Sequence, residues 1–126
     1  MKNIQSKLVY VPIVLAGSAY IVAGTSKLLG IPGLHASFAL MGLPVWFGYF
    51  IGACEVTGGL GLFNRKFSAL AAACLLGIMA GAIYFHLYFE VAAHALPAVI
   101  LSMLLLFIIK VRRVDSIWFV LTRTEN

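Results

Sequence analysis

Hydrophobic residues fall into four long runs along the chain, separated by short polar or turn-forming segments. The runs cover about residues 8–29, 45–63, 67–89 and 94–110. A helix needs about 20 predominantly apolar residues to cross the hydrocarbon core of a bilayer. We therefore predict an all-α membrane protein, a four-transmembrane-helix bundle that forms a single transmembrane domain over residues 1–126.

The segments between the runs predict the connections. Gly and Pro residues at 30–33 end the first span, and the less apolar residues 34–43 are expected to form a short interfacial helix between spans one and two. Residues 64–66 are polar and too few for anything but a tight turn between antiparallel helices. Residues 115–122 are too short to cross, so we expect them to lie at the membrane surface with Trp118 as an anchor.

Composition excludes a soluble domain. The chain is 63% hydrophobic and 10% charged, whereas soluble domains are about 45–50% apolar and about 25% charged. A length of 126 residues leaves no room for a catalytic domain outside the membrane. No run of Lys and Arg alternates with aromatic residues, so we do not expect nucleic acid as a partner.

Basic residues predict the orientation, because they accumulate in short cytoplasmic loops. If both termini are cytoplasmic, Lys27 is the only Lys or Arg on the outer side. The three histidines, His35, His86 and His94, and the acid Glu90 also lie there. The remaining basic residues all lie inside: Lys2, Lys7, Arg65, Lys66, Lys110, Arg112, Arg113 and Arg123. We expect an integral protein of the bacterial inner membrane with both termini in the cytoplasm.

Glu55 is the acid within a predicted span. It lies ten residues after Val45, or about 15 Å along a helix, which places it near the middle of the bilayer. An acid there costs roughly 2.5–3.5 kcal/mol unless it is neutral, paired or faces a polar cavity. Gly48, Gly52 and Gly59 share its helical face, and small residues permit close helix contact. Glu55 is therefore predicted to point into the bundle.

Three further polar residues can join Glu55. The stem of Lys27, near the outer end of span one, can bend inward to Glu55 or outward to the lipid headgroups. His86, at a similar level in span three, is either a proton relay or an interfacial residue bonded to water or lipid. Tyr20 precedes Lys27 by seven residues and shares its face. Together they predict a polar pocket that opens to the outer side.

His86, Glu90 and His94 are spaced four and four apart, which suggests a metal site. On a continuous helix, however, the two histidines would be about 12 Å apart along the axis, too far to share one ion at bond lengths of about 2 Å. At most an adjacent pair would form a weak site. We expect surface polar groups and no metal site.

Small residues in the third span are interpreted as a surface for helix packing. Ala73, Gly77 and Gly81 recur every four residues, which predicts a close contact with the glycines of span two. Cys54 and Cys74 lack the close spacing of a redox pair. We expect both to be packing residues, and a disulfide between them stays open as an alternative.

Several of these segments carry a resemblance. AGTSKLLG closes the first span, a proline precedes the second, IGACEVTGGLGL forms most of it, and MAGAIYFHL ends the third. From about Ala16 to Leu87 the chain resembles the DoxX-like family of small four-helix membrane proteins. The polar residues that recur in this family match Lys27, Glu55 and His86.

The resemblance implies a function in the membrane. Members of the family are associated with quinone-linked oxidation of sulfur compounds and with membrane oxidoreductase or detoxification complexes, which implies an oxidoreductase partner. The sequence has no flavin, haem or iron–sulfur motif, so a membrane quinone or the partner must carry electrons. We expect no covalently bound cofactor.

The predicted roles follow from this hypothesis. A quinone would be held by Tyr20, Lys27 and Glu55. Glu55 would exchange a proton, and Lys27 would hold the Glu55 carboxylate or a quinone oxygen. His86 would pass protons outward. The alternative is a non-enzymatic assembly factor that binds other transmembrane helices. Self-association into a homo-oligomer is left open.

Overall fold

The computed structural model describes residues 7–116. This part of the chain is helical and has no strand. Its α-helices are α2 (Tyr10–Leu28), α3 (Pro32–Leu40), α4 (Val45–Leu62), α5 (Ser68–Phe89) and α6 (Leu96–Arg112), and its short 3-10 helices are η1 (Ala92–Ala95) and η2 (Arg113–Asp115).

Within the described residues, four segments are long and apolar enough to cross a membrane: α2, α4, α5 and the stretch Ala92–Asp115 that contains α6. The predicted four-span helical fold is confirmed. Of the predicted surface segment 115–122, residues 117–122, including Trp118, lie outside the described residues, as do Lys2 and Arg123.

The short helix between the first two spans is also confirmed. α3 begins at Pro32, because proline is favoured in a first helical turn, where its missing N–H needs no partner. Gly30 and Gly42 both have φ of +76°, a left-handed conformation that glycine adopts without strain at the ends of helices. Gly30 thus follows the end of α2 and leads into α3, and Gly42 follows the end of α3 and leads into α4.

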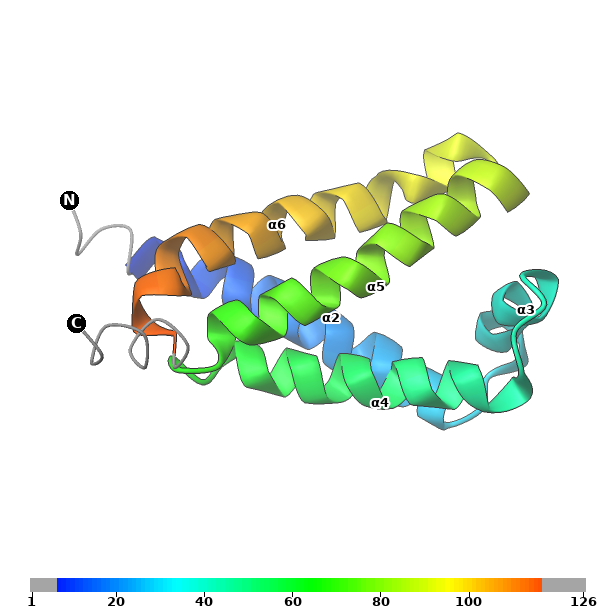
Figure 1. Cartoon of the computed structure of the whole chain (residues 1–126), viewed down its shortest axis with the longest axis horizontal. Helices are drawn as coiled ribbons and strands as arrows, with labels where there is room; N and C mark the ends of the chain where they lie inside the picture. The colour runs from blue at the N-terminus through cyan, green and yellow to red at the C-terminus, as the bar shows by residue number, and fades with distance from the viewer. Residues whose placement is uncertain (1–6, 117–126) are drawn as a thin grey trace, which may run out of the picture.

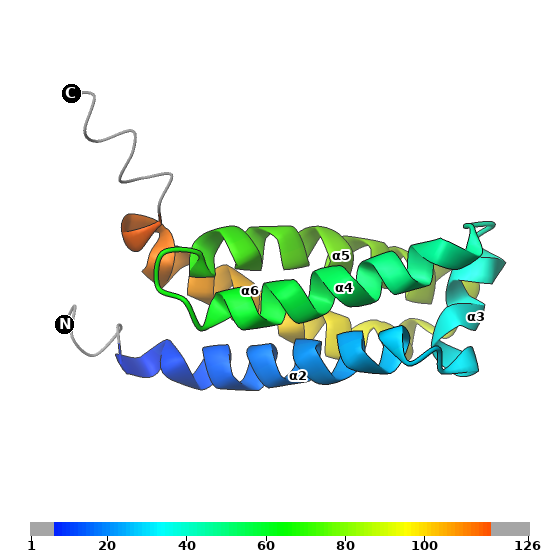
Figure 2. The same ribbon diagram turned by 90° about the horizontal axis from the view of Figure 1, so that it is seen from below.

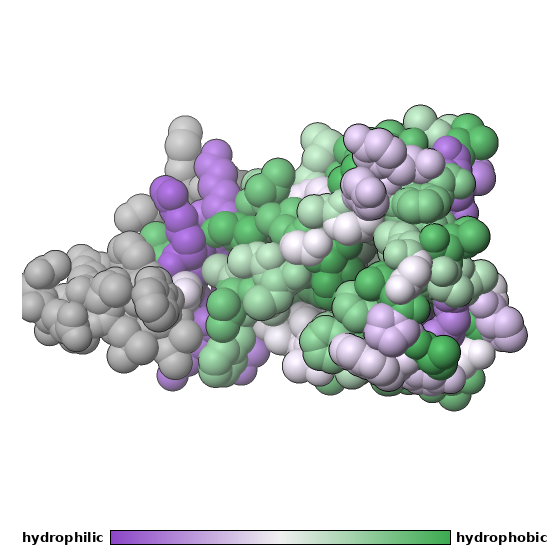
Figure 3. Space-filling view, turned by 45° about the vertical axis from the view of Figure 1, so that its right-hand side comes forward, coloured by the Kyte–Doolittle hydropathy of each residue, from purple (hydrophilic) through white to green (hydrophobic). Residues whose placement is uncertain are grey.

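The spans alternate in direction (Figures 1 and 2). α2 packs against α4, and α5 packs against α6. The start of α2, the α4–α5 turn and the end of α6 lie together, and we call this the basic end; its basic residues are Lys7, Arg65, Lys66, Lys110, Arg112 and Arg113. The opposite end is called the histidine end, and its residues include His35, His86, Glu90 and His94. In Figure 3 hydrophilic residues gather toward both ends of a largely hydrophobic surface.

Glycines bring α2 and α4 into backbone contact. A Cβ built on Gly24 would lie 2.5 Å from the carbonyl oxygen of Gly52, and one on Gly59 would lie 3.0 Å from the carbonyl oxygen of Gly17. Gly52, Glu55 and Gly59 are all buried, as their common face predicted. The helix that this face contacts is α2.

α5 contacts α4 near the basic end and separates from it toward the histidine end (Figure 1). A Cβ on Gly58 of α4 would lie 2.8 Å from the Leu75 side chain, whereas one on Gly77 or Gly81 would meet nothing within 4 Å. The predicted contact of Ala73, Gly77 and Gly81 with the glycines of the second span is therefore wrong. Small residues permit close approach, but at Gly77 and Gly81 the distance between α5 and α4 is too large for contact.

Candidate functional site

The separation of α5 from α4 accompanies a cavity of about 840 Å³. Small-molecule sites have volumes of about 300–1,000 Å³, so this cavity is large enough for a ligand. Most of its wall is apolar, with side chains such as those of Phe47, Ile51, Ile78 and Phe85. Its titratable lining residues are Tyr20, Lys27, Glu55, Cys74, Tyr84, His86 and Glu90.

The cavity is open along part of α5. Cys74, Gly77 and Gly81 belong to its lining and are nevertheless exposed. α5 is long and apolar enough to span the membrane, so these exposed lining residues lie within a membrane-spanning helix. Cys74 is thus not the packing residue that we predicted, and Cys54 and Cys74 are both free thiols rather than a disulfide.

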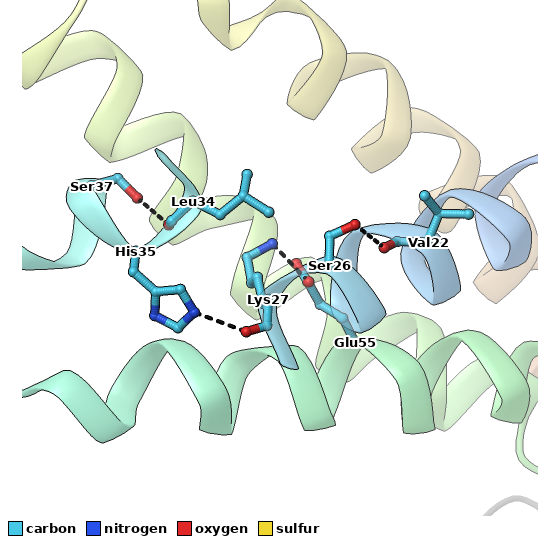
Figure 4. Close-up of polar contacts among 7 residues, drawn as sticks. All are labelled: Val22, Ser26, Lys27, Leu34, His35, Ser37 and Glu55. Atoms are coloured by element: carbon cyan, nitrogen blue, oxygen red, sulfur yellow. Dashed lines mark hydrogen bonds and ion pairs between the residues drawn. The ribbon is translucent and has the colours of Figure 1, made fainter. Parts of the chain in front are cut away.

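Lys27 and Glu55 form an ion pair across α2 and α4 (Figure 4). Lys27 Nζ lies 2.8 Å from Glu55 Oε2, and the side chains are only 15% and 4% exposed. Gly52 makes room for the pair, because a Cβ there would lie 2.9 Å from Lys27 Cβ. The inward alternative for Lys27 is the one that forms, and it offsets much of the cost of placing an acid inside the bundle.

The Tyr20 side chain also lines the cavity. Tyr20 is 1% exposed, and its hydroxyl has no hydrogen-bond partner among the described residues. Buried hydroxyl groups almost always have a partner, since an unpaired one costs free energy. The hydroxyl oxygen is buried as well, so a ligand oxygen can pair with it only after a small movement of the side chains around it.

His86 lines the same cavity but contacts neither Lys27 nor Glu55 through a hydrogen bond in the described structure. Its Nδ1 atom lies 2.7 Å from Oε2 of Glu90 instead. The hydrogen bond with His86, and to a smaller extent the one with His94, holds the pKa of the Glu90 carboxyl below its usual range. Of the predicted polar pocket, the structure joins Lys27 to Glu55 and places His86 elsewhere on the same wall.

His94 lies much closer to His86 than it would on a continuous helix. One ligand atom from each of His86, Glu90 and His94 can be chosen so that all lie within 4.8 Å of one another. The separation of about 12 Å that a continuous helix would give does not apply, because α5 ends at Phe89. Glu90 leaves the helix with φ of −136° and ψ of −168°, and η1 brings His94 back beside it.

His35 has a positioning role that the sequence did not indicate. Its Nε2 atom lies 2.8 Å from the backbone oxygen of Lys27 (Figure 4), and its ring centroid lies 4.5 Å from that of Tyr49. The ring also occupies the space where a Cβ of Gly48 would lie. His35 thus holds α3 against α2 and α4, and α3 supplies Leu34 and other residues to the cavity wall. The sequence offered only indirect signs: Gly48 lies on the same helical face as Glu55, and His35 lies in the short segment just before that helix.

Comparison with known protein families gives a match to the DoxX-like family over residues 11–108. Comparisons with curated proteins and with solved structures give no match. The matched region contains Lys27, Glu55 and His86, and it continues into the fourth span, beyond the segments that carried the resemblance. Together with the four spans, this match shows that the chain is an integral membrane protein that belongs to the DoxX-like family.

Proposed function

We propose that the chain is a small membrane subunit of a quinone-linked oxidoreductase or detoxification complex, and that the cavity binds the quinone head group. One observation carries the proposal: a largely apolar cavity has the buried Lys27–Glu55 pair and the unpartnered Tyr20 hydroxyl in its wall. Apolar pockets with a few convergent polar groups are typical of small-molecule sites.

The residues present suit a quinone. A quinone head group is a flat ring with two carbonyl oxygens, and the apolar wall can bury the ring. Lys27 Nζ and the Tyr20 hydroxyl can donate hydrogen bonds to an oxygen. The opening beside Gly77 and Gly81 lies along a membrane-spanning helix, so an apolar tail can remain in the bilayer.

When bound, a quinone supplies two-electron, two-proton chemistry, and a partner oxidoreductase exchanges the electrons with it. Glu55 then exchanges a proton at its carboxylate. Lys27 stabilises the charged form of Glu55, and when Glu55 is protonated the ammonium group becomes available to a ligand oxygen. His86 lies on the cavity wall beside the exposed Glu90, so it can exchange protons with the outside at the histidine end.

The test measures quinone bound to the gently extracted protein by mass spectrometry. Gly81→Leu places a side chain in the cavity where nothing lies within 4 Å of an added Cβ, so we expect loss of the quinone from a folded protein. Ala80→Leu is the matched control, because Ala80 is exposed and lies outside the lining. Glu55→Gln is expected to lower quinone occupancy and to abolish any linked electron transfer. A wild-type protein that contains only ordinary lipids, like all three variants, would contradict the proposal.

The non-enzymatic alternative uses the same opening differently. The exposed Gly77 and Gly81 could receive a transmembrane helix of another protein, because small residues permit close approach. In that case Gly81→Leu would reduce crosslinking to a membrane partner, and no quinone would be present in the wild type. The same pair of variants therefore separates the two functions.

We also propose that the basic end lies in the cytoplasm of a bacterial cell, with both termini on that side of the inner membrane. The position of Lys7, Arg65, Lys66 and the basic residues of α6 at one end of the bundle supports this orientation. A fluorescent reporter that folds only in the cytoplasm, fused to the C-terminus, is expected to fluoresce. A dark fusion of normal abundance would contradict it.

A further inference from the structure

We propose that His86, Glu90 and His94 bind a divalent transition-metal ion of the zinc type at the histidine end of the cavity. Nδ1 of His86 and Nδ1 of His94 lie 2.7 Å and 3.2 Å from the same oxygen of Glu90. One donor atom from each residue lies within 4.8 Å of the other two. Three ligand atoms thus converge on one point although the residues span two helical segments.

Only a small movement would complete the site. Ligand atoms in a tetrahedral zinc site are about 3.4 Å apart, given bond lengths of about 2.1 Å. The side chains of Glu90 and His94 are 37% and 61% exposed, so they are free to move toward an ion. The break in α5 at Glu90 is what brings them together, since η1 places His94 beside His86.

The donor set indicates the class of metal. Two imidazole nitrogens and one carboxylate oxygen suit zinc, copper or nickel, whereas calcium and magnesium prefer all-oxygen sites. Three protein ligands leave a coordination position free for water or another ligand. His86 and Glu90 line the cavity, so the ion would lie at its wall.

An ion here would change the role available to His86. It would bind the Nδ1 atom with which His86 now contacts Glu90, so the other ring nitrogen would carry the proton. His86 could then not pass protons through Nδ1, and an ion would be expected to slow the proposed proton exchange. The metal site itself does not depend on the proposed quinone function, because its test uses the metal alone.

The first experiment titrates zinc into the full chain, purified in detergent without a histidine tag and treated with a chelator. We expect saturable binding of one equivalent, and affinity weakened about tenfold or more in His86→Ala and in His94→Ala. His35→Gln is the matched control, because His35 lies at the same end but contacts Lys27 and Tyr49 instead. No saturable binding, or an equal loss in the control, would overturn the site.

The second experiment does not depend on affinity. Electron paramagnetic resonance of the copper-loaded wild type should show hyperfine coupling to two nitrogens, and His94→Ala should reduce it to one. His94 is exposed, so this variant is expected to elute and to unfold like the wild type. A wild-type spectrum with a single nitrogen, or one unchanged in His94→Ala, would contradict the proposal.

Discussion

Lys27 Nζ lies 2.8 Å from Glu55 Oε2, and the pair joins the last turn of α2 to the middle of α4. Both residues come from helices whose backbones touch at glycines. The pair thus combines two functions in one contact: it lets an acid reside inside the bundle, and it places a charged group in a cavity wall.

Removing the lysine should destabilise the fold more than removing the acid. Lys27→Met leaves a buried carboxylate without its partner, which costs about 3–5 kcal/mol in buried pairs. Glu55→Gln should cost less, because Lys27 can extend toward the headgroups. The double variant should recover most of the loss. Denaturant unfolding in detergent measures all three.

The exposed pair at the basic end provides the control for that series. Arg65 Nε lies 3.1 Å from Asp115 Oδ2, with the arginine side chain 66% exposed. Exposed pairs contribute about 0–1 kcal/mol, so Arg65→Gln should change the free energy of unfolding little. If Lys27→Met were no more harmful than Arg65→Gln, the buried pair would not stabilise the protein.

Two glycine substitutions should have opposite effects. A Cβ on Gly24 would lie 2.5 Å from a backbone oxygen and 2.8 Å from the backbone nitrogen of Val56, so Gly24→Ala should destabilise the protein by about 1–3 kcal/mol. Gly77 has nothing within 4 Å of an added Cβ, so Gly77→Ala should be neutral or stabilise α5 by about 0.5–1 kcal/mol. Thermal unfolding of both variants compares them. Equal destabilisation would contradict the separation of α5 from α4.

His35 and Gly48 should show strong coupling. The His35 ring occupies the position of a Gly48 Cβ, so Gly48→Ala should cost about 1–3 kcal/mol in the wild type. In a His35→Ala background that space is free, and the cost should fall close to zero. A double-mutant cycle of unfolding free energies measures the coupling. Additive effects would show that the ring does not lie over Gly48 in solution.

Tyr20→Phe should separate stability from ligand binding. The hydroxyl has no partner among the described residues, so its removal should leave the ligand-free protein unchanged or up to about 1 kcal/mol more stable. If the hydroxyl binds a ligand oxygen, affinity for a quinone should fall about three- to tenfold. A titration of the reconstituted protein measures affinity. Lower stability with unchanged affinity would mean that the hydroxyl is paired within the protein.

The four spans and the inward direction of Glu55 could be predicted from the sequence, because span length and helical periodicity decide them. The contact partner of Lys27 could not, since its flexible stem reaches both Glu55 and the headgroups. The end of the third span at residue 89 was predicted too, but the position of His94 was not, because residues 90–95 contain neither Gly nor Pro and nothing in them specifies how the chain turns there.

The glycine stripes show the same limit. The face of Gly52 and Gly59 was identified correctly, but periodicity does not name the helix on the other side. The contact is with α2, and Gly77 and Gly81 border the cavity instead. Spacing predicts which residues share a face, whereas three-dimensional packing decides what that face meets.

The divergence of α5 from α4 has a consequence for selectivity. In residues 7–116, the side-chain hydrogen bonds that join elements at the histidine end each stay on one side of the cavity: Lys27 to Glu55 and His35 to Lys27 join α2, α3 and α4, and His86 and His94 to Glu90 join α5 to η1. A change in the angle between the two sides would thus break no such bond at this end, and what resists it is the apolar core that α2 shares with α5 and α6. Hydrogen bonds therefore do not fix the width of the cavity, and rings of different bulk should be accepted as long as they offer an acceptor to Lys27. Discrimination would then rest on the chemistry of one oxygen rather than on molecular shape.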